Sequence, residues 1–191
     1  MVGLREHLWT SRDEQQLRGF ARSRCVSVDP GANGGVALWS EWGSLEDAET
    51  YGKSTECVGY VAQYIASFAP RVLVVESQYL GSKAGAPLAD SSLKLARAAG
   101  YLIGAAAALI VAKRGGDVEL VLVRPATWQR WLRCGEPSRS AKKRAALVAA
   151  AEALDKRPNA RAAQRQGLAD AYCIGRAWWD VMESPDSAAV A

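Results

Sequence analysis

The sequence predicts one α/β domain built on a mixed sheet of five strands flanked by helices. Short apolar runs rich in β-branched residues alternate with longer segments of helical periodicity, which is typical of α/β proteins. Two of the apolar runs are joined by a tight glycine-rich turn, which indicates an antiparallel pair. The chain has 191 residues, 49% of them hydrophobic, and a chain of this length forms a single core.

The first two strands are predicted on either side of the glycine-rich turn. Residues 26–29 are largely apolar up to Asp29, residues 30–35 hold Pro30 and three glycines, and residues 36–39 are apolar again. Turn-forming residues between two β-forming runs predict a hairpin. The hairpin leaves Asp29 at the tip of a buried strand, where a carboxylate is rare unless it is paired or bound to a metal. The alternative role of Asp29 is to cap the turn.

The remaining elements follow from periodicity and from the residues that interrupt it. Residues 1–22 are predicted as an amphipathic helical extension, and residues 23–185 as the domain itself. The elements predicted after the hairpin are an edge strand near 47–53, a helix over 55–68, a strand over 71–76, a long helix from 90 or 91 to about 112, a strand over 118–123, a short helix from 125, a basic loop and helix over 133–154, a polar loop over 155–165 and a final helix.

Two further acids share the setting of Asp29. Glu76 closes a buried-strand pattern, and Asp170 lies in the small, apolar segment 167–175, which predicts a helix packed on the sheet. Three carboxylates that leave apolar elements in distant parts of the chain predict one shared metal site. Magnesium takes few protein carboxylates and keeps positions open for water and phosphate, and two such ions can clamp a phosphodiester during displacement.

Each of these two acids also has a plainer interpretation. Glu76 can be a surface acid at the end of its strand. Asp170 can cap a helix or form an ion pair with Arg176 or Lys142.

The ordered set of residues 29–31, Glu76 and residues 169–171 resembles the RuvC-type Holliday junction resolvases of the RNase H-like superfamily, and the phage-type members above all. The resemblance extends from about Cys25 to Trp179. It implies an RNase H-like fold and a metal-dependent endonuclease that resolves four-way DNA junctions by paired symmetric nicks. It also implies two Mg²⁺ ions, with Mn²⁺ able to substitute, held by the three acids and activating a water for attack on the phosphate.

One part of the family pattern is missing from this chain. The resemblance implies an acid or histidine three or four positions before the last aspartate, where this chain has Gly167 and Gln166. Neither carries a negative charge, although Gln166 can offer a carbonyl oxygen. The departure leaves three outcomes open: weaker binding of one metal, a ligand from elsewhere such as Asp180, or a loss of cleavage. Asp180 lies about 15 Å further along the same helix, too far to substitute easily.

Basic residues gather between the predicted fifth strand and the final helix, where Glu136 is the only nearby acid. Their sign bias and the neighbouring Trp128 and Trp131 favour contacts with nucleic-acid phosphates. The alternative for the basic stretch is a solvated face. The two tryptophans themselves are predicted to lie in the core rather than to contact DNA. The predicted DNA-binding residues are Tyr79, Lys83, Arg130, Arg133, Arg139, Lys142, Lys143 and Arg144.

The resemblance assigns roles to three of these residues. A lysine at the start of the basic helix approaches the scissile phosphate, and Lys142 or Lys143 fits that position as a catalytic residue that stabilises developing charge. An aromatic residue stands at the rim of the site, where Tyr79 fits and can wedge between bases at the crossover. The alternative for Tyr79 is a partly buried loop aromatic.

The long helix predicted over 91–112 carries a face of small residues, among them Gly100 and Gly104. Such a face packs closely, either on the protein's own sheet or on a second copy. The resemblance implies a homodimer through this helix, which suits a substrate of two-fold symmetry. Residues 98–112 are uncharged, but a bilayer needs roughly 20 apolar residues. The sequence therefore predicts no membrane span.

The net charge of +4 is compatible with nucleic acid but does not demand it. Four scattered cysteines and a single histidine argue against a zinc site and predict free thiols in a reducing compartment. The N-terminus has no secretory pattern. These features predict a cytoplasmic protein, in a bacterium or a phage-infected cell by the resemblance.

Other functional hypotheses stay open beside the junction-resolving nuclease. One is a broader branch or flap endonuclease on the same fold. Another is a protein that binds junctions or branched DNA with weak or no cleavage, which Gln166 and Gly167 make credible. A last one uses Asp29 and the glycine turn for nucleotide phosphates, although no second phosphate-binding glycine loop is evident.

Overall fold

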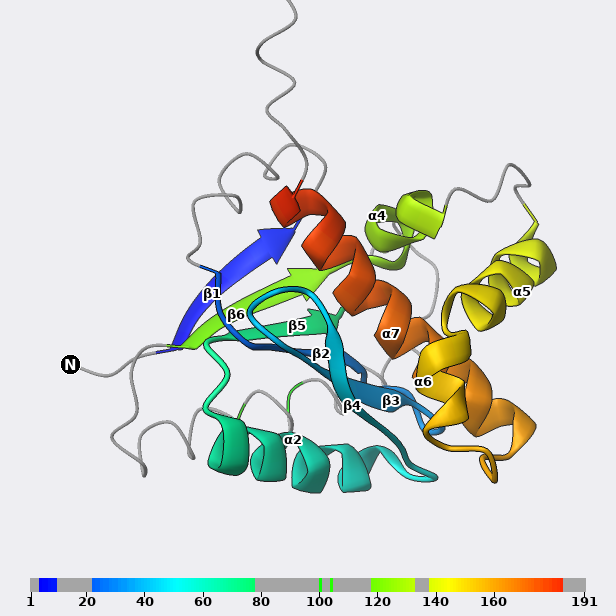
Figure 1. Cartoon of the computed structure of the whole chain (residues 1–191), viewed down its shortest axis with the longest axis horizontal. Helices are drawn as coiled ribbons and strands as arrows, with labels where there is room; N and C mark the ends of the chain where they lie inside the picture. Colours follow the sequence, from blue (N-terminus) through cyan, green and yellow to red (C-terminus); the bar gives the residue numbers. More distant parts are fainter. Residues whose placement is uncertain are drawn as a thin grey trace, which may run out of the picture.

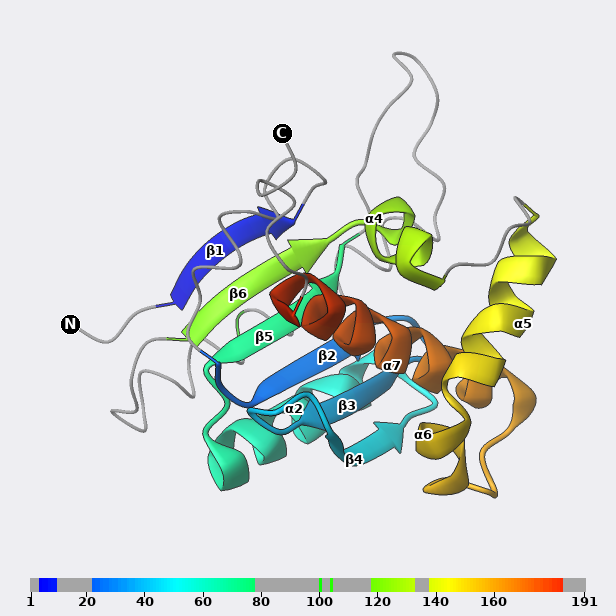
Figure 2. The ribbon, with the colours of Figure 1, turned by 45° about the horizontal axis from the view of Figure 1, so that its top comes forward.

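The centre of the fold is a six-stranded mixed sheet (Figure 1). The structure is a computed structural model, and it describes residues 4–9, 22–77, 100, 104, 118–132 and 138–183. Across the sheet the strands follow the order β1–β6–β5–β2–β3–β4 (Figure 2). Their bounds are Leu4–Trp9 for β1, Cys25–Asp29 for β2, Gly35–Trp39 for β3, Leu45–Thr50 for β4, Val72–Glu76 for β5 and Val118–Val123 for β6.

The strand directions follow from the connections. The pairs β2–β3 and β3–β4 are antiparallel and are joined by short turns. The pairs β2–β5, β5–β6 and β1–β6 are parallel. The predicted α/β class, with a mixed sheet flanked by helices, is therefore confirmed, and the sheet has one strand more than the five predicted.

The additional strand comes from the N-terminal residues. The prediction of a helical extension over residues 1–22 is wrong for Leu4–Trp9, which pairs with β6 from Leu4↔Val118 to Trp9↔Val123. Pairing with the open edge of β6 is a long-range interaction that overrides local periodicity. Trp9 is fully buried and meets Trp178 edge to face, with ring centroids 5.9 Å apart, which anchors the strand. The domain boundary at residue 23 stays a prediction.

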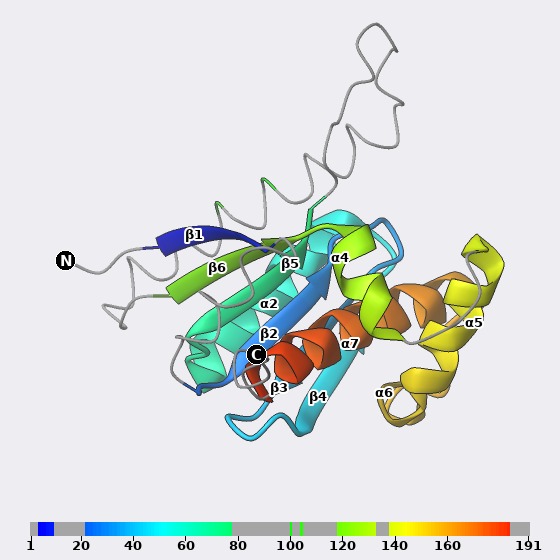
Figure 3. The same ribbon diagram turned by 90° about the horizontal axis from the view of Figure 1, so that it is seen from above.

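Helices cover both faces of the sheet. Helix α2 (Ser54–Phe68) lies under one face, and α7 (Ala162–Glu183) crosses the other, with α5 and α6 beside it (Figures 1 and 3). Helix α7 begins inside the segment predicted as a polar loop. Within the described ranges, no helix combines the length and apolar character that crossing a bilayer requires. The helices that pack against α7 are α4 (Pro125–Gln129), α5 (Arg139–Ala149) and α6 (Ala151–Asp155), with a 3₁₀ turn, η1 (Arg130–Leu132), after α4.

Alternation along the strands decides which helix each side chain meets. Val26 and Val28 of β2 belong to the core on the α2 side, whereas Cys25 belongs to the core under α7. The same alternation turns Asp29 and Glu76, at the ends of their strands, toward α7. The free thiols predicted from the sequence are confirmed for three buried cysteines, Cys25, Cys57 and Cys173.

A buried serine ties the sheet to α7. Ser27 is fully buried, and its hydroxyl donates to the Ala171 carbonyl at 2.8 Å and accepts from Trp39 Nε1 at 2.9 Å. We expect Ser27→Ala to lower the free energy of unfolding by about 1–3 kcal/mol, because Trp39 Nε1 is left buried and unsatisfied and the Ala171 carbonyl loses one of its donors. Urea unfolding measures this. Ser44→Ala, at an exposed site, is the matched control, and an equal loss in both variants would contradict the prediction.

The long helix predicted over 91–112 lies outside the described residues except for Gly100 and Gly104. Both glycines are helical and exposed, and a Cβ built on either would meet nothing within 4 Å. An open position at both glycines leaves room for another surface. The dimer contact predicted there stays a prediction.

Candidate active site

The ends of β2 and β5 bring two of the predicted acids to one edge of the sheet. The strands are parallel neighbours with Val28 opposite Val75, so Asp29 and Glu76 are the next residues on each. Neighbouring strands lie about 4.8 Å apart, which makes the two acids neighbours. Glu76 is only 8% exposed, whereas Asp29 is half-buried. The hairpin and the buried strand thus form this half of the site as predicted.

Helix α7 delivers the third acid. It approaches the turn between β2 and β3 so closely that Gly34 and Gly167 form a backbone bridge. Asp170 follows Gly167 by three residues, nearly one helical turn, and therefore projects from the same side of α7. Asp170 therefore lies on the part of α7 that approaches the β2–β3 turn, and its role as a metal ligand stays a prediction.

The negative charges of the three acids act on the pKa values of Asp29 and Glu76. Burial raises the pKa of Asp29 from 3.8 to about 7, the negative charge of Asp170 adds to the rise, and a hydrogen bond from the Gly31 N–H opposes it. Burial also raises the pKa of Glu76 well above its usual range, with further increases from Asp29 and Asp170. Such mutual repulsion requires that the three groups lie close together.

The indole of Trp128 faces this cluster from α4. Trp128 is 2% exposed, and its contact with Glu76 lowers the pKa of that carboxyl. In the described part of the chain, its Nε1 makes no hydrogen bond of good geometry. A small shift of Glu76 toward Nε1 would satisfy both groups. The prediction that Trp128 belongs to the core is confirmed, but its position against Glu76 was not foreseeable from the sequence.

Asp29 also fills the alternative role considered for it. Its Oδ1 accepts a hydrogen bond from the Gly31 N–H at 3.0 Å, so the side chain caps the turn. The hydroxyl of Tyr51 donates to the Asp29 carbonyl and fixes the backbone there. Within the described residues, Oδ2 of Asp29 makes no hydrogen bond and stays available to a ligand.

The missing fourth acid has a structural explanation. A Cβ on Gly167 would overlap the Asn33 carbonyl oxygen and come within 2.5 Å of the Gly34 Cα, so this position holds no side chain. Gln166 uses its amide instead, since Nε2 donates to Asp170 Oδ1 at 2.9 Å. Asp180 pairs with Arg176 at 2.8 Å, further along α7. The site therefore contains three acids, one of which is held by a neutral amide.

The donor set suits a hard divalent cation. All three side chains offer carboxylate oxygens, the ligands that Mg²⁺ and Mn²⁺ take. Among the described residues, no group of three or more His, Cys, Asp or Glu side chains is arranged so that it could hold a metal ion. Magnesium is ordinarily held by one or two carboxylates together with waters and substrate phosphate, so a complete cage is not required for a fit.

The predicted basic residues stand on the elements beside α7. Arg130 is exposed, 6.0 Å from the centre of the Trp131 ring, and Lys143 is exposed on α5. Lys142 Nζ lies 3.5 Å from Gln129 Oε1 rather than against the acids. Arg144 is also exposed, Arg139 begins α5, and Tyr79, Lys83 and Arg133 lie outside the described residues.

Comparison with known proteins gives the class of fold. No protein-family model and no curated protein matches the chain. The chain has the fold of the Holliday junction resolvases, as an RNase H-like α/β domain.

Resolvases are among the solved structures similar to this chain. The yeast mitochondrial Holliday junction resolvase Ydc2 aligns with a TM-score of 0.58 and 13% identity over 90% of this chain and 87% of its own. Thermus thermophilus RuvC in complex with Holliday junction substrate aligns with a TM-score of 0.49 and 18% identity over 84% of this chain and 96% of its own. T. thermophilus RuvC alone aligns with a TM-score of 0.47 and 17% identity over 83% of this chain and 96% of its own. The fold implied by the RuvC-type resemblance is confirmed, and the phage-type placement stays a prediction.

The amide of Gln166 offers a direct test of the site. We expect Gln166→Glu to lower the stability of the metal-free protein by about 1–2 kcal/mol at neutral pH, because a like charge replaces a donated hydrogen bond. We also expect Mn²⁺ to bind about tenfold more tightly, because a fourth carboxylate joins the site. Calorimetry and thermal unfolding with and without Mn²⁺ measure both. Gln63→Glu, on the exposed face of α2, is the control, and unchanged Mn²⁺ affinity in Gln166→Glu would contradict the prediction.

Proposed function

We propose that the protein is a metal-dependent endonuclease that resolves four-way DNA junctions by paired symmetric nicks. One observation carries the proposal. Asp29, Glu76 and Asp170 come from three separate elements, and their charges raise the pKa values of Asp29 and Glu76. The fold shared with Holliday junction resolvases supports it. Three like charges held together in a folded protein cost stability, and they are tolerated where a cation or a reaction uses them.

The acids are proposed to hold two Mg²⁺ ions, for which Mn²⁺ can substitute. When bound, the ions supply activation of a water and stabilisation of charge on the phosphate. Gln166 fixes one oxygen of Asp170, the turn at Gly31 fixes one oxygen of Asp29, and Trp128 limits the access of water to Glu76. Hydrogen bonds thus orient the Asp29 and Asp170 carboxylates before substrate arrives.

The basic elements beside α7 are proposed to hold the DNA. Lys142 or Lys143 would stabilise charge on the scissile phosphate, and Lys142 can reach it by releasing its 3.5 Å contact with Gln129. Arg130, Arg139 and Arg144 would contact phosphates, together with Lys83 and Arg133, while Tyr79 would wedge at the crossover. A homodimer through the 91–112 helix would present two sites to a two-fold symmetric junction.

A second candidate function is binding of branched DNA with little cleavage. The specific observation in its favour is that Gln166 and Gly167 stand where a further charged ligand is expected, and that the Gln166 amide occupies Asp170 Oδ1. A broader branch or flap endonuclease would use the same acids, and only its substrates would differ.

The decisive experiment is a cleavage and binding assay of the purified chain on end-labelled DNA. The substrates are a four-way junction, a flap and a linear duplex, each with Mg²⁺, Mn²⁺ or chelator. Paired, symmetric, metal-dependent nicks confined to the junction are the expected result. Comparable cutting of the flap would favour the broader nuclease, and tight junction binding without nicks under either metal would overturn the proposed cleavage in favour of the binding protein.

A further inference from the structure

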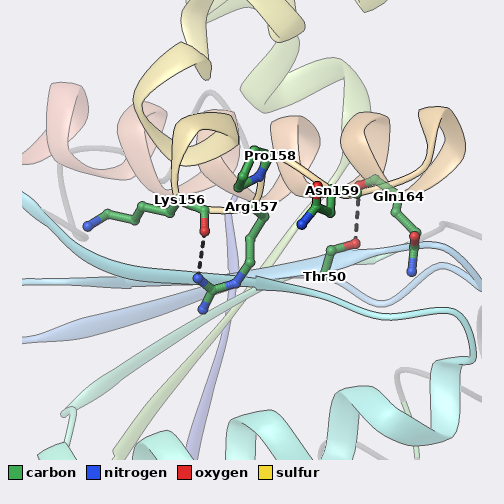
Figure 4. Close-up of a pocket in the computed structure, with 7 residues that line it drawn as sticks. Thr50, Lys156, Arg157, Pro158, Asn159 and Gln164 are labelled. Atoms are coloured by element: carbon green, nitrogen blue, oxygen red, sulfur yellow. Dashed lines mark hydrogen bonds between the residues drawn. The ribbon is translucent and has the colours of Figure 1, made fainter.

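A pocket of about 360 Å³ opens at the edge of the sheet, between β4 and the loop that joins α6 to α7 (Figure 4). Thr50 forms its floor, and its hydroxyl lies 3.2 Å from the Gln164 carbonyl of α7. Asn159 reaches from the loop toward Thr50, with Lys156 and Gln164 on opposite flanks. The residues that line the pocket are Thr50, Lys156, Arg157, Pro158, Asn159, Ala160 and Gln164.

The pocket lies in the same row of the sheet as the acids. Asp29 pairs with Gly35 on β3, and Gly35 pairs with Thr50 on β4. Two strand spacings separate Asp29 from Thr50, which amounts to about 10 Å. A DNA strand that crosses this row would therefore pass the acids and the pocket within a few nucleotides.

Several hydrogen-bond donors gather at this pocket. Gln164 Oε1 accepts from the Arg161 backbone N–H at 3.1 Å, which leaves its Nε2 as a donor. A Cβ built on Gly52 would lie 3.9 Å from both Gln164 Nε2 and Arg161 Nη2, so the two donors converge beside Gly52. The amide of exposed Asn159 adds another donor from the loop. Amides and guanidinium groups arranged in this way suit a phosphate.

Two cations at the pocket are not neutralised by an ion pair. Among the described residues, neither Lys156 nor Arg161 makes an ion pair, and the nearby Glu56 is bound to the Gly52 N–H at 2.9 Å. Arg157 is committed elsewhere, since its Nε donates to Glu49 at 2.8 Å and its Nη2 reaches Asp47 at 3.4 Å. Arg157 thus fixes the loop to the sheet edge and leaves the other two cations available.

We propose that this pocket binds a backbone phosphate of the cleaved DNA strand, within a few nucleotides of the bond that is cut. Arg161 and Gln164 supply the converging donors beside Gly52, Asn159 supplies a further donor, and Lys156 adds charge from the opposite flank. The proposal rests on the proposed function, because it needs a DNA strand at the acids. A contact of this kind fixes the register of the strand in the site and carries no base specificity.

The test compares two double variants of the full chain. Lys156→Ala with Arg161→Ala removes the pocket's cations, and Arg22→Ala with Arg71→Ala removes two exposed cations at the opposite end of β2 and β5. Binding of a labelled four-way junction is measured in chelator over a range of salt. We expect the pocket variant to bind about tenfold more weakly. The slope of log K against log salt should also be smaller in magnitude by about 1–2. The control variant should bind like the wild type.

Methylphosphonate substitution locates the phosphate. A single neutral linkage is placed at successive positions on either side of the branch point. We expect one position within a few nucleotides of the nick to weaken wild-type binding and to have no further effect in the pocket variant. Equal sensitivity of both proteins at every position would overturn the site.

Other results separate this site from the proposed function. If the wild type binds and cuts junctions, and the pocket variant binds and cuts them equally well, only the pocket assignment fails. If the wild type binds no branched DNA, the proposed function and the pocket assignment both fail. If calorimetry shows inorganic phosphate bound by the wild type and lost in the pocket variant, while junction binding is unchanged, the pocket takes free phosphate and the proposal is overturned.

Discussion

We expect Asp29→Asn to abolish metal-dependent cutting of four-way junctions and, at the same time, to stabilise the metal-free protein at mildly alkaline pH. The first effect follows from the loss of a proposed metal ligand. Removing even an outer partner of a metal ligand typically costs about 10–100-fold, so the loss of cutting here should exceed about 100-fold. The second effect follows from the raised pKa of this carboxyl.

The sign of the stability effect can be worked out from the two pKa values. In the unfolded chain Asp29 ionises near 3.8, whereas in the folded protein burial and the charge of Asp170 raise its pKa to about 7. Between these values the folded state binds the additional proton, so stability falls as the pH rises, and the full penalty applies above about pH 7. One pKa unit corresponds to about 1.4 kcal/mol. Asparagine avoids the penalty, and we expect a gain of about 2–4 kcal/mol.

Thermal unfolding in chelator at about pH 4 and about pH 8 measures the second effect. The gain should be present at the higher pH and largely absent at the lower one. Adding Mn²⁺ should stabilise the wild type by mass action and leave the variant unchanged. Asp180→Asn is the matched control, since this acid is paired with Arg176 on the same helix at 2.8 Å. A variant of Asp29 that still cuts junctions would remove this residue from the proposed metal site.

Local patterns in the sequence were sufficient to predict most of the sheet. The alternation over Val118–Val123 and the glycine-rich turn after Asp29 depend on neighbouring residues alone, and both predicted elements are present. Strand β1 could not be predicted in this way. Its conformation depends on pairing with β6 more than a hundred residues away. The start of α7 could not be predicted from the local pattern either, because polar residues precede those of its apolar face.

The acids were predictable, but their contacts were not. Asp29, Glu76 and Asp170 stand out because each is a charge on an apolar element, and the structure brings them together. The hydrogen bond from Gln166 and the position of Trp128 depend on how α7 and α4 pack, which no local pattern records. The basic residues of α5 stand beside α7 as a group. Their contacts with DNA stay a prediction, because a charge pattern indicates a partner but not its position.

We expect Gly167→Ala to destabilise the fold and to disable the site through one added methyl group. The new Cβ would overlap the Asn33 carbonyl oxygen and lie within 2.5 Å of the Gly34 Cα, and both are backbone atoms that no rotamer change can move. Helix α7 must retreat from the β2–β3 turn. Overpacking of this kind costs about 3 kcal/mol at the upper end of the usual range. The retreat also moves Asp170 away from Asp29, and a displacement of about 1 Å can cost about 100-fold in rate.

Gly59→Ala separates this effect from the general consequence of losing a glycine. Gly59 lies in the interior of α2, is exposed, and a Cβ there would meet nothing within 4 Å. The same substitution should therefore stabilise the protein by about 0.5–1 kcal/mol, because alanine favours the helix. Urea unfolding and junction cutting of both variants decide the matter. If Gly167→Ala unfolds and cuts like the wild type, then α7 does not need its close approach to the hairpin, and the distance between Asp170 and Asp29 is set by other contacts.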